Sequence, residues 1–350
     1  MNTLSSDISK LVGRMIIVGL KGHEEKDVYN FFDENRNYPV GGIILYDEDI
    51  TTTPSSPHNI RSPKQLKDFT KCLQDLSPDP LIIGIDQEGG KVNRLKKDYG
   101  FKDSITMAEI GNINDLERTA AESNRTIQTL KECGINLNFS PVLDLNISQD
   151  NIVTAKERAI SSNPKTVTDH AKIIMNCHHE NNVIAVGKHF PGQGSSIGDT
   201  HEGWVDVTNS WSKEELIPYK NLIESNDILA VMTSHLFNKN LDAKYPATIS
   251  KKIVDGLLRK KLNFKGVVIS DDPQMKALSK KYSLKKLIEL MINAGVDIFC
   301  FGNNMVYDAS IVKRIHRSVL ELINEERVQI SMLQRANERI TTLRNKIGLK

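Results

Sequence analysis

The sequence is short of the features that mark several large classes of protein. Its 350 residues include four cysteines, which lie far apart with no pair at CxxC spacing. This argues against a zinc knuckle or a disulfide framework and is typical of a reducing compartment. The formal net charge is only +2, with no basic excess and no acidic tail, so a nucleic-acid partner is not indicated.

Long apolar runs are also missing. No stretch approaches the length that crosses a membrane. The N-terminal stretch MNTLSSDISKLVGRMIIVGLKG has no basic segment followed by a long apolar one, which predicts that there is no signal peptide. From these two absences we expect a soluble, cytoplasmic protein without a membrane partner.

What the sequence does contain is a series of short apolar runs. They are nearly continuous rather than alternating, as in parallel strands buried on both faces. Segments with apolar residues at helical spacing separate most of them. The eight runs lie at 15–20, 41–46, 81–86, 135–144, 183–189, 228–235, 266–272 and 296–302. Eight strands alternating with helices predict a (β/α)8 (TIM) barrel, with residues 1–350 as a single domain.

An open doubly wound sheet is the alternative fold, but no GxGxxG follows the first run and no P-loop motif occurs. Ser62-Pro63 and Thr166 are predicted to start two of the helices. Residues 306–345 form a long, charged amphipathic segment, which we interpret as terminal helices packed on the barrel. The Thr-, Ser- and Pro-rich residues 47–63 are predicted to be one long loop.

Polar side chains stand where six of the eight apolar runs stop. In (β/α)8 barrels the active site is built at the carboxyl ends of the strands, so these side chains should converge on one crevice. They are Asp86, Asp144, Lys188 with His189, Ser234 with His235, Ser270 with Asp271 and Asp272, and Asn303 with Asn304.

Two chemistries fit these side chains. Carboxylates at strand ends can cleave a glycosidic bond, where one attacks and another group handles the leaving-group proton. Alternatively, the Lys, His and Asp residues could surround one or two metal ions, as in barrel metallohydrolases. That arrangement needs an HxH pair after the first strand, where this chain has only His23. The glycosidase interpretation is favoured, and no metal or other cofactor is expected.

Three segments carry a family resemblance: IGIDQEGGKVNRL (83–95), GKHFPGQGSSIGDTH (187–201) and GVVISDDPQM (266–275). In this order and spacing they closely resemble glycoside hydrolase family 3, in its subgroup of bacterial β-N-acetylglucosaminidases that act on peptidoglycan fragments. The resemblance implies a retaining exo-β-N-acetylglucosaminidase with a small carbohydrate substrate. It also implies a role in recycling GlcNAc–anhydro-muramoyl peptides in the cytoplasm. We expect a monomer.

The resemblance implies three catalytic residues. Asp271 matches the nucleophile, which would form a covalent glycosyl-enzyme intermediate. His201 matches an unusual acid/base histidine on a mobile loop, paired with Asp199. An imidazole titrates near neutrality, so it can give a proton to the leaving oxygen and later take one from water. Three glycines are expected to let this loop swing: Gly192, Gly194 and Gly198.

Five further residues match sugar-binding positions of the family: Asp86, Arg94, Arg158, Lys188 and His189. The match of Arg158 is looser, because the loop SQDNIVTAKERA departs from the family pattern. For Lys188, a structural ion pair with Asp86 or Asp144 is an alternative, since a lysine at a buried strand end needs a polar partner.

The remaining polar positions have less specific expectations. Asp272 is expected to support local hydrogen bonding, and Glu88 to belong to the architecture of its loop. His235 would line the pocket or orient a neighbour. Gln193 stands where family members usually have histidine, and glutamine cannot titrate, so this departure argues against a pH-dependent task at this position.

Two other functions remain open at this point. One is a catalytically silent sugar-binding barrel, whose mark would be loss of the nucleophile or of the Asp-His pair; both are present in this sequence. The other is a metal-dependent barrel hydrolase, which sensitivity to a chelator would support.

Overall fold

Eight parallel strands form the centre of the computed structural model, which describes residues 3–53, 55–148 and 150–349. Their order is β10–β1–β2–β5–β6–β7–β8–β9, and a parallel bridge between Ile269 and Ile298 joins the two edges. The predicted barrel and its eight strands are confirmed. The strands are β1 (Ile16–Gly19), β2 (Gly42–Leu45), β5 (Ile82–Ile85), β6 (Leu137–Asn138), β7 (Ile184–Phe190), β8 (Ala230–Thr233), β9 (Val267–Ile269) and β10 (Phe299–Phe301).

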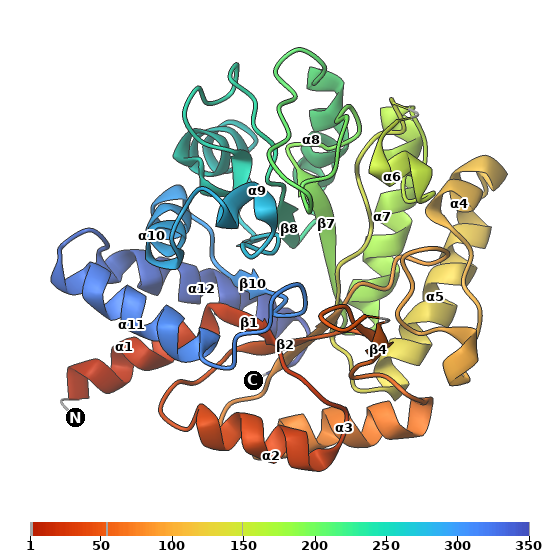
Figure 1. The fold of residues 1–350 in the computed structure, drawn as a ribbon. Helices are drawn as coiled ribbons and strands as arrows, with labels where there is room; N and C mark the ends of the chain where they lie inside the picture. Colours follow the sequence, from red (N-terminus) through yellow and green to blue (C-terminus); the bar gives the residue numbers. More distant parts are fainter. Residues whose placement is uncertain (1–2, 54, 149, 350) are drawn as a thin grey trace.

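Helices surround these strands on the outside (Figure 1). Every residue of β1, β2 and β5 is buried, because side chains fill the barrel on one face and helices cover the other. The α-helices are α1 (Thr3–Arg14), α2 (Glu25–Glu34), α3 (Pro63–Leu76), α4 (Met107–Ile113), α5 (Leu116–Glu132), α6 (Ile152–Ala155), α7 (Pro164–Glu180), α8 (Ile217–Glu224), α9 (Lys276–Ser279), α10 (Leu284–Ala294), α11 (Ile311–Asn324) and α12 (Ile330–Lys346). Short 3-10 helices lie at η1 (Lys97–Tyr99), η2 (Lys213–Leu216) and η3 (Ala247–Ile249), and a π-helix at η4 (Lys252–Lys261).

The two predicted helix starts have different outcomes. α3 begins at Pro63, and the Ser62 hydroxyl accepts a hydrogen bond from the Gln65 N–H, so this prediction is confirmed. α7 begins at Pro164, two residues before the predicted Thr166. The side chain of Asn163 caps it by accepting from the Lys165 N–H, and proline fits the first helical position.

Two segments differ from or extend the predictions. The expected loop 47–63 contains a small antiparallel pair, β3 (Glu48–Asp49) with β4 (Ser56–Pro57). The terminal helices are confirmed as α11 and α12, and both pack on α1, a helix that was not predicted. Within the described residues, no helix combines the length and apolar character of a membrane span.

Candidate active site

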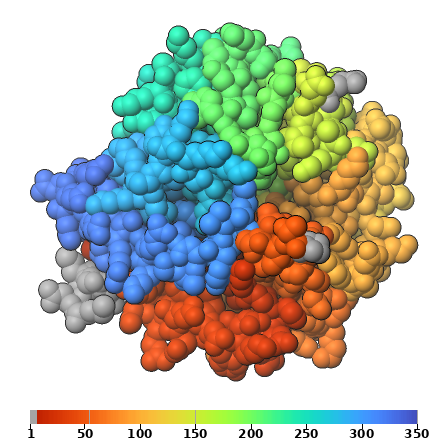
Figure 2. Space-filling model, in the orientation of Figure 1, coloured from red at the N-terminus to blue at the C-terminus, as the bar shows by residue number. Residues whose placement is uncertain are grey.

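A cavity of about 160 Å³ opens at the carboxyl ends of the barrel strands. The space-filling view shows a hollow near the middle of this face, where segments coloured orange, green and blue meet (Figure 2). All eight residues that the resemblance assigned to catalysis or sugar binding line this cavity: Asp86, Arg94, Arg158, Lys188, His189, Asp199, His201 and Asp271. They come from six different segments of the chain, and only the closed barrel brings them together.

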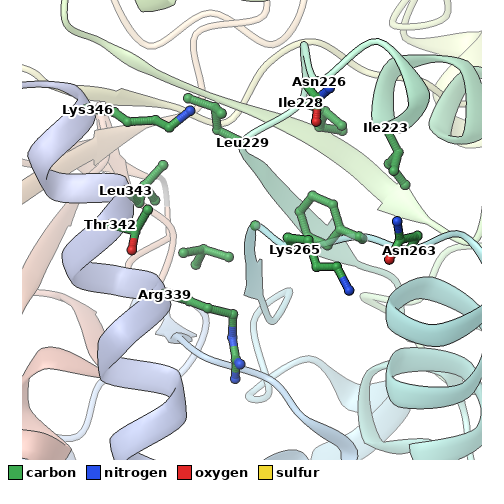
Figure 3. A pocket seen from close by; sticks show the side chains of 13 residues that line it. Ile223, Asn226, Ile228, Leu229, Asn263, Lys265, Arg339, Thr342, Leu343 and Lys346 are labelled. Carbon is green, nitrogen blue, oxygen red and sulfur yellow. The ribbon is translucent and has the colours of Figure 1, made fainter.

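A second hollow, of about 260 Å³, lies at the opposite end of the barrel (Figure 3). It is bordered by α12 and by residues that precede β8 and β9, such as Leu229 and Lys265. Of the described residues, those that line it include no aspartate or glutamate. In barrels this end contributes to stability rather than to catalysis, so the candidate site is the cavity at the carboxyl ends.

A buried lysine, a mostly buried arginine and two carboxylates form the floor of the cavity. The Lys188 Nζ atom lies 2.7 Å from Asp86 Oδ1 and 2.6 Å from Glu88 Oε1. The Arg158 guanidinium donates two hydrogen bonds to Glu88, from Nε at 2.7 Å and from Nη2 at 2.8 Å. The structural ion pair considered as an alternative for Lys188 is present, with Asp86 and not with Asp144. Glu88, which the sequence suggested was loop architecture, is a shared partner of both cations.

These ion pairs set the protonation states on the floor. Burial alone would raise the pKa of Glu88, but Arg158 and Lys188 outweigh it and hold that pKa well below the usual glutamate range. Burial would also lower the pKa of Lys188, yet Asp86 and Glu88 raise it overall. The floor therefore carries fixed charges at neutral pH, and these can accept and donate hydrogen bonds to a polar ligand.

We expect Glu88→Gln to lower the free energy of unfolding by about 3 kcal/mol, because Arg158 loses its carboxylate partner and Lys188 loses one of two. Since the pKa of Glu88 is lowered, its contribution is complete above the ordinary glutamate value of 4.5 and is lost as the pH falls below it. Between pH 7 and pH 4, the free energy of unfolding of the variant should therefore fall less than that of the parent. Denaturant unfolding at pH 7 and at pH 4 measures both effects.

The matched control is Glu157→Gln. Glu157 pairs with Lys91 at 3.0 Å, but its side chain is 46% exposed, so its loss should cost less than about 1 kcal/mol. Equal losses of stability in the two variants would contradict a structural role for Glu88.

The other sugar-binding candidates are also held by carboxylates. His189 Nδ1 lies 2.7 Å from Asp144 Oδ2, so Asp144 stands behind the cavity wall and orients the imidazole. Arg94 Nη1 lies 3.4 Å from Asp47 Oδ1, and its Nη2 lies 3.9 Å from Asp86 Oδ2. Asp47 and Asp144 are supporting residues, since neither of them lines the cavity.

Asp271 follows β9, and its carboxylate faces the cavity. Its Oδ1 accepts the Asp272 N–H at 2.8 Å. Burial would raise the pKa of Asp271, but His235, His189 and His201 outweigh it and lower that pKa. Asp271 is therefore ionised at neutral pH.

The next residue, Asp272, has the opposite tendency, since burial raises its pKa to about 7. Its carbonyl accepts a hydrogen bond from His235 Nε2 at 2.8 Å. Of the two roles expected for His235, the structure shows the orienting one. Asp272 supports local hydrogen bonding as expected, since its Oδ1 accepts the Gln274 N–H at 2.9 Å.

The Asp199–His201 pair lies on the loop after β7. His201 Nδ1 is 2.6 Å from Asp199 Oδ1, and the same oxygen accepts the His201 N–H at 2.9 Å. The hydrogen bond to Asp199 raises the pKa of His201 above its ordinary value, and the same bond lowers the pKa of Asp199 to about 2. Since Nδ1 is bound to the carboxylate, Nε2 is the nitrogen left to face a ligand.

The base of this loop is fixed. Residues 191–196 are buried, and the buried Glu215 carboxyl accepts the Gly194 N–H at 2.6 Å and the Ser195 hydroxyl at 2.5 Å. A side chain at Gly192, whose φ is +114°, would collide with Glu215. Of the three glycines expected to act as hinges, only Gly198, with φ of +112°, lies in the exposed part. These contacts therefore limit the predicted swing of the loop to the residues that follow Ser196.

No motif in the sequence indicated the residues that hold this loop in place. One is Glu215, which lies in η2, and the other is Asn151, which precedes α6 and donates through its side-chain amide to the Gln193 carbonyl at 2.6 Å and the Ser196 carbonyl at 2.8 Å. Neither is part of a motif that indicated a site. The described residues include no cluster of three or more His, Cys, Asp or Glu side chains placed to hold a metal ion.

A (β/α)8 barrel with carboxylates and an Asp–His pair around its mouth has the architecture of a barrel glycoside hydrolase. Comparison with known proteins gives the family. The model of the glycosyl hydrolase family 3 N terminal domain matches residues 12–343. The chain therefore belongs to glycosyl hydrolase family 3, and its class is that of a glycoside hydrolase.

Individual relatives agree with this assignment. A beta-hexosaminidase of Nitrosomonas eutropha is 32% identical over 274 residues, which cover 76% of this chain and 74% of that protein. A solved glycoside hydrolase family 3 beta-N-acetylglucosaminidase from Paenibacillus sp. strain FPU-7 superposes with a TM-score of 0.87 at 27% identity. The match covers 100% of this chain but only 63% of that one, so this chain spans less than two thirds of its length. The beta-N-acetylglucosaminidase of Thermotoga maritima gives a TM-score of 0.76 at 27% identity, covering 96% of this chain and 67% of that one.

Proposed function

We propose that this protein is a retaining exo-β-N-acetylglucosaminidase. The observation that carries the proposal is the pairing of opposite protonation states in one cavity. The pKa of Asp271 is lowered and that of His201 is raised, so the surroundings favour the carboxylate form of Asp271 and the imidazolium form of His201 in the same cavity. Two titratable groups whose environments push their pKa values apart are the mark of an assigned nucleophile and acid.

The proposed reaction has two steps. In the first, an Asp271 carboxylate oxygen attacks the anomeric carbon, the glycosidic C–O bond breaks, and His201 Nε2 donates its proton to the leaving oxygen. In the second, His201 takes a proton from water, whose oxygen attacks the anomeric carbon and releases Asp271. Each step inverts the anomeric centre, so the β configuration is retained.

Asp199 stabilises the imidazolium of the first step and fixes the tautomer of the second, through its 2.6 Å bond to Nδ1. Asp86, Lys188, His189, Arg94 and Arg158 are proposed to bind the hydroxyl groups of the sugar. Their mutual ion pairs hold them in place before substrate arrives, which reduces the reorganisation needed on binding.

For the substrate, we propose terminal β-linked N-acetylglucosamine, consistent with the relatives named beta-hexosaminidase and beta-N-acetylglucosaminidase. The finer assignments are also proposals: a monomer in the cytoplasm that releases GlcNAc from GlcNAc–anhydro-muramoyl peptides during cell-wall recycling. These finer assignments rest on the family resemblance.

We expect an aryl β-N-acetylglucosaminide to be hydrolysed with kcat/KM at least about tenfold above that of the matching aryl β-glucoside, and equally well with or without chelator. NMR of the first-formed sugar should show the β anomer. Preference for the glucoside would contradict the specificity, and a first-formed α anomer would contradict retention.

The same assay separates the two alternatives. No turnover of either substrate by folded protein would favour the silent sugar-binding barrel, and loss of activity with chelator would favour a metal-dependent hydrolase.

A further inference from the structure

A buried carboxyl group lies directly against the base of the loop that carries the proposed acid. Glu215 is 0% exposed, and its two carboxyl oxygens accept the Gly194 N–H at 2.6 Å and the Ser195 hydroxyl at 2.5 Å. A side chain at Gly192 would lie 2.5 Å from the Glu215 Cβ atom, so the backbone of the loop comes as close to this residue as glycine allows. The carboxyl group and the base of the loop therefore form one tightly packed unit.

The surroundings of Glu215 differ from those of Glu88 on the cavity floor. Glu88 has two cationic partners, whereas within the described parts of the chain no lysine, arginine or histidine nitrogen lies within 4 Å of Glu215. The titratable groups that face Glu215 are Asp144, behind the cavity wall, and Tyr219 of α8, and both can carry only negative charge. A buried carboxylate without a cation depends on hydrogen-bond donors, and the donors here belong to the loop.

The protonation of Glu215 is balanced between these influences. Burial and the charge of Asp144 raise its pKa, the bonds from Ser195 and Gly194 lower it, and the result is a pKa raised to about 7. Above that pH the ionised group accepts through both oxygens. As the pH falls through 7 it takes up a proton, one oxygen becomes a donor, and the charge-assisted bonds to the loop are weakened.

A short link joins the base of the loop to the acid. Ser196 is fully buried, and only Ile197 and Gly198 separate it from Asp199. Two extended residues span about 7 Å at most, so a shift of the base carries over to the Asp199–His201 pair. A displacement of about 1 Å at a reacting group can cost about 10²-fold in rate.

We propose that Glu215 is a positioning residue for the acid: its carboxylate holds the base of the loop so that His201 reaches the glycosidic oxygen. This inference rests on the proposed function and adds a residue on which the acid depends. Glu215 does not line the cavity, so it acts through the loop and not on the sugar. Its loss should therefore matter most for substrates that need the acid, and little for those whose leaving group departs without a proton.

The test compares Glu215→Gln with the parent on phenyl and 2,4-dinitrophenyl β-N-acetylglucosaminide, at the pH optimum of the parent. Glutamine has the size of glutamate but keeps one accepting oxygen, and its NH2 group faces a donor of the loop. We expect kcat/KM to fall by about 10²-fold for the phenyl glycoside and by less than about threefold for the dinitrophenyl glycoside.

Glu214→Gln is the matched control, because Glu214 is the adjacent carboxyl group of η2 and is exposed. Its kcat/KM should equal the parent's for both glycosides. Ser195→Ala is a second variant, which removes one donor and no charge, and it should lower kcat/KM for the phenyl glycoside alone, by about tenfold. Thermal unfolding verifies that each variant is folded, and Ser195→Ala carries the test if Glu215→Gln is not.

The pH profile gives a readout that a purely structural role would not change. The parent's kcat/KM for the phenyl glycoside should decline as the pH falls through about 7, and Glu215→Gln, which cannot titrate, should flatten this limb. The pKa of Asp271 is lowered, so the nucleophile does not set this limb. Burial also raises the pKa of Asp272 to about 7, so Asp272→Asn is measured beside it and should retain the limb.

The outcomes distinguish the positioning role from the function on which it rests. An equal fall for the two glycosides in Glu215→Gln or Ser195→Ala, or no fall for either, would overturn the positioning role alone. So would an acid limb that Asp272→Asn removes and Glu215→Gln retains. Absence of turnover of both glycosides by the folded parent would instead overturn the proposed function, and the positioning role with it.

Discussion

Asp271→Asn should reduce kcat/KM for an aryl β-N-acetylglucosaminide by about 10⁴-fold or more, because an amide cannot form the covalent intermediate. The substitution preserves the shape of the side chain, and its amide oxygen can still accept the Asp272 N–H that Asp271 Oδ1 accepts at 2.8 Å. The folded structure should therefore survive, and thermal unfolding can verify this. The loss of kcat/KM then reports the contribution of the nucleophile and not a change in packing.

The matched control is the adjacent carboxyl group. Burial raises the pKa of Asp272 to about 7, so part of it is already neutral at physiological pH, and Asp272→Asn resembles that form. Its activity should fall far less than that of Asp271→Asn. Similar losses in the two variants would contradict the assignment of Asp271.

Trapping identifies the nucleophile directly. A slow fluorinated substrate should label the peptide that contains Asp271 in the parent and leave Asp271→Asn unlabelled, as read by mass spectrometry. With Asp271→Ala, azide should enter the vacated space and give an α-glycosyl azide from an activated β substrate. A label on another carboxylate would place the nucleophile elsewhere.

The sequence predicted the barrel well because its strands are short, apolar and followed by polar residues. Runs such as 81–86 and 183–189 reach from a buried strand into the cavity, so the same pattern that marked the strand also marked Asp86 and Lys188. The run 135–144 was a weaker guide, since only Leu137 and Asn138 pair as β6. Its polar end, Asp144, lies behind the cavity wall and forms a hydrogen bond with the imidazole of His189.

The supporting residues could not be predicted, because their roles depend on contacts between distant segments. Glu88 follows a strand as many loop carboxylates do, and its importance comes from Arg158, 70 positions further along the chain. Asn151 and Glu215 hold the loop base from two separate segments, at separations of 42 residues from Gln193 and 21 from Gly194. Spacing within one segment carries no information about such contacts.

Gln193 illustrates the same limit at a single residue. The sequence has an amide where the family usually has histidine, and this substitution assigns no role to the side chain. The structure shows that the backbone of Gln193 maintains the loop while its side chain lines the cavity. The backbone contacts of Gln193 do not depend on which side chain the residue carries, whereas its contribution to the cavity wall does.

His201→Ala should lower kcat/KM by about 10²- to 10⁴-fold for substrates with poor leaving groups, the usual size of a general acid's contribution. The loss should shrink as the leaving group becomes more acidic, because a dinitrophenolate departs without a proton. A plot of log kcat/KM against the pKa of the leaving phenol should therefore be steep for the variant and shallow for the parent. Equal losses across the series would show that His201 is not the acid.

The pH profile tests the pairing with Asp199. His201 must be protonated in the first step, so activity should decline as the pH rises through its pKa, and the hydrogen bond to Asp199 raises that pKa. Asp199→Asn removes this largest raising contribution, so the basic limb of kcat/KM should move to lower pH. Glu202→Gln is the control, because Glu202 is an exposed neighbour paired with Lys276 at 3.0 Å. The pH profile of Glu202→Gln should match that of the parent. If Asp199→Asn does not shift the basic limb of kcat/KM, a group other than the Asp199–His201 pair determines that limb.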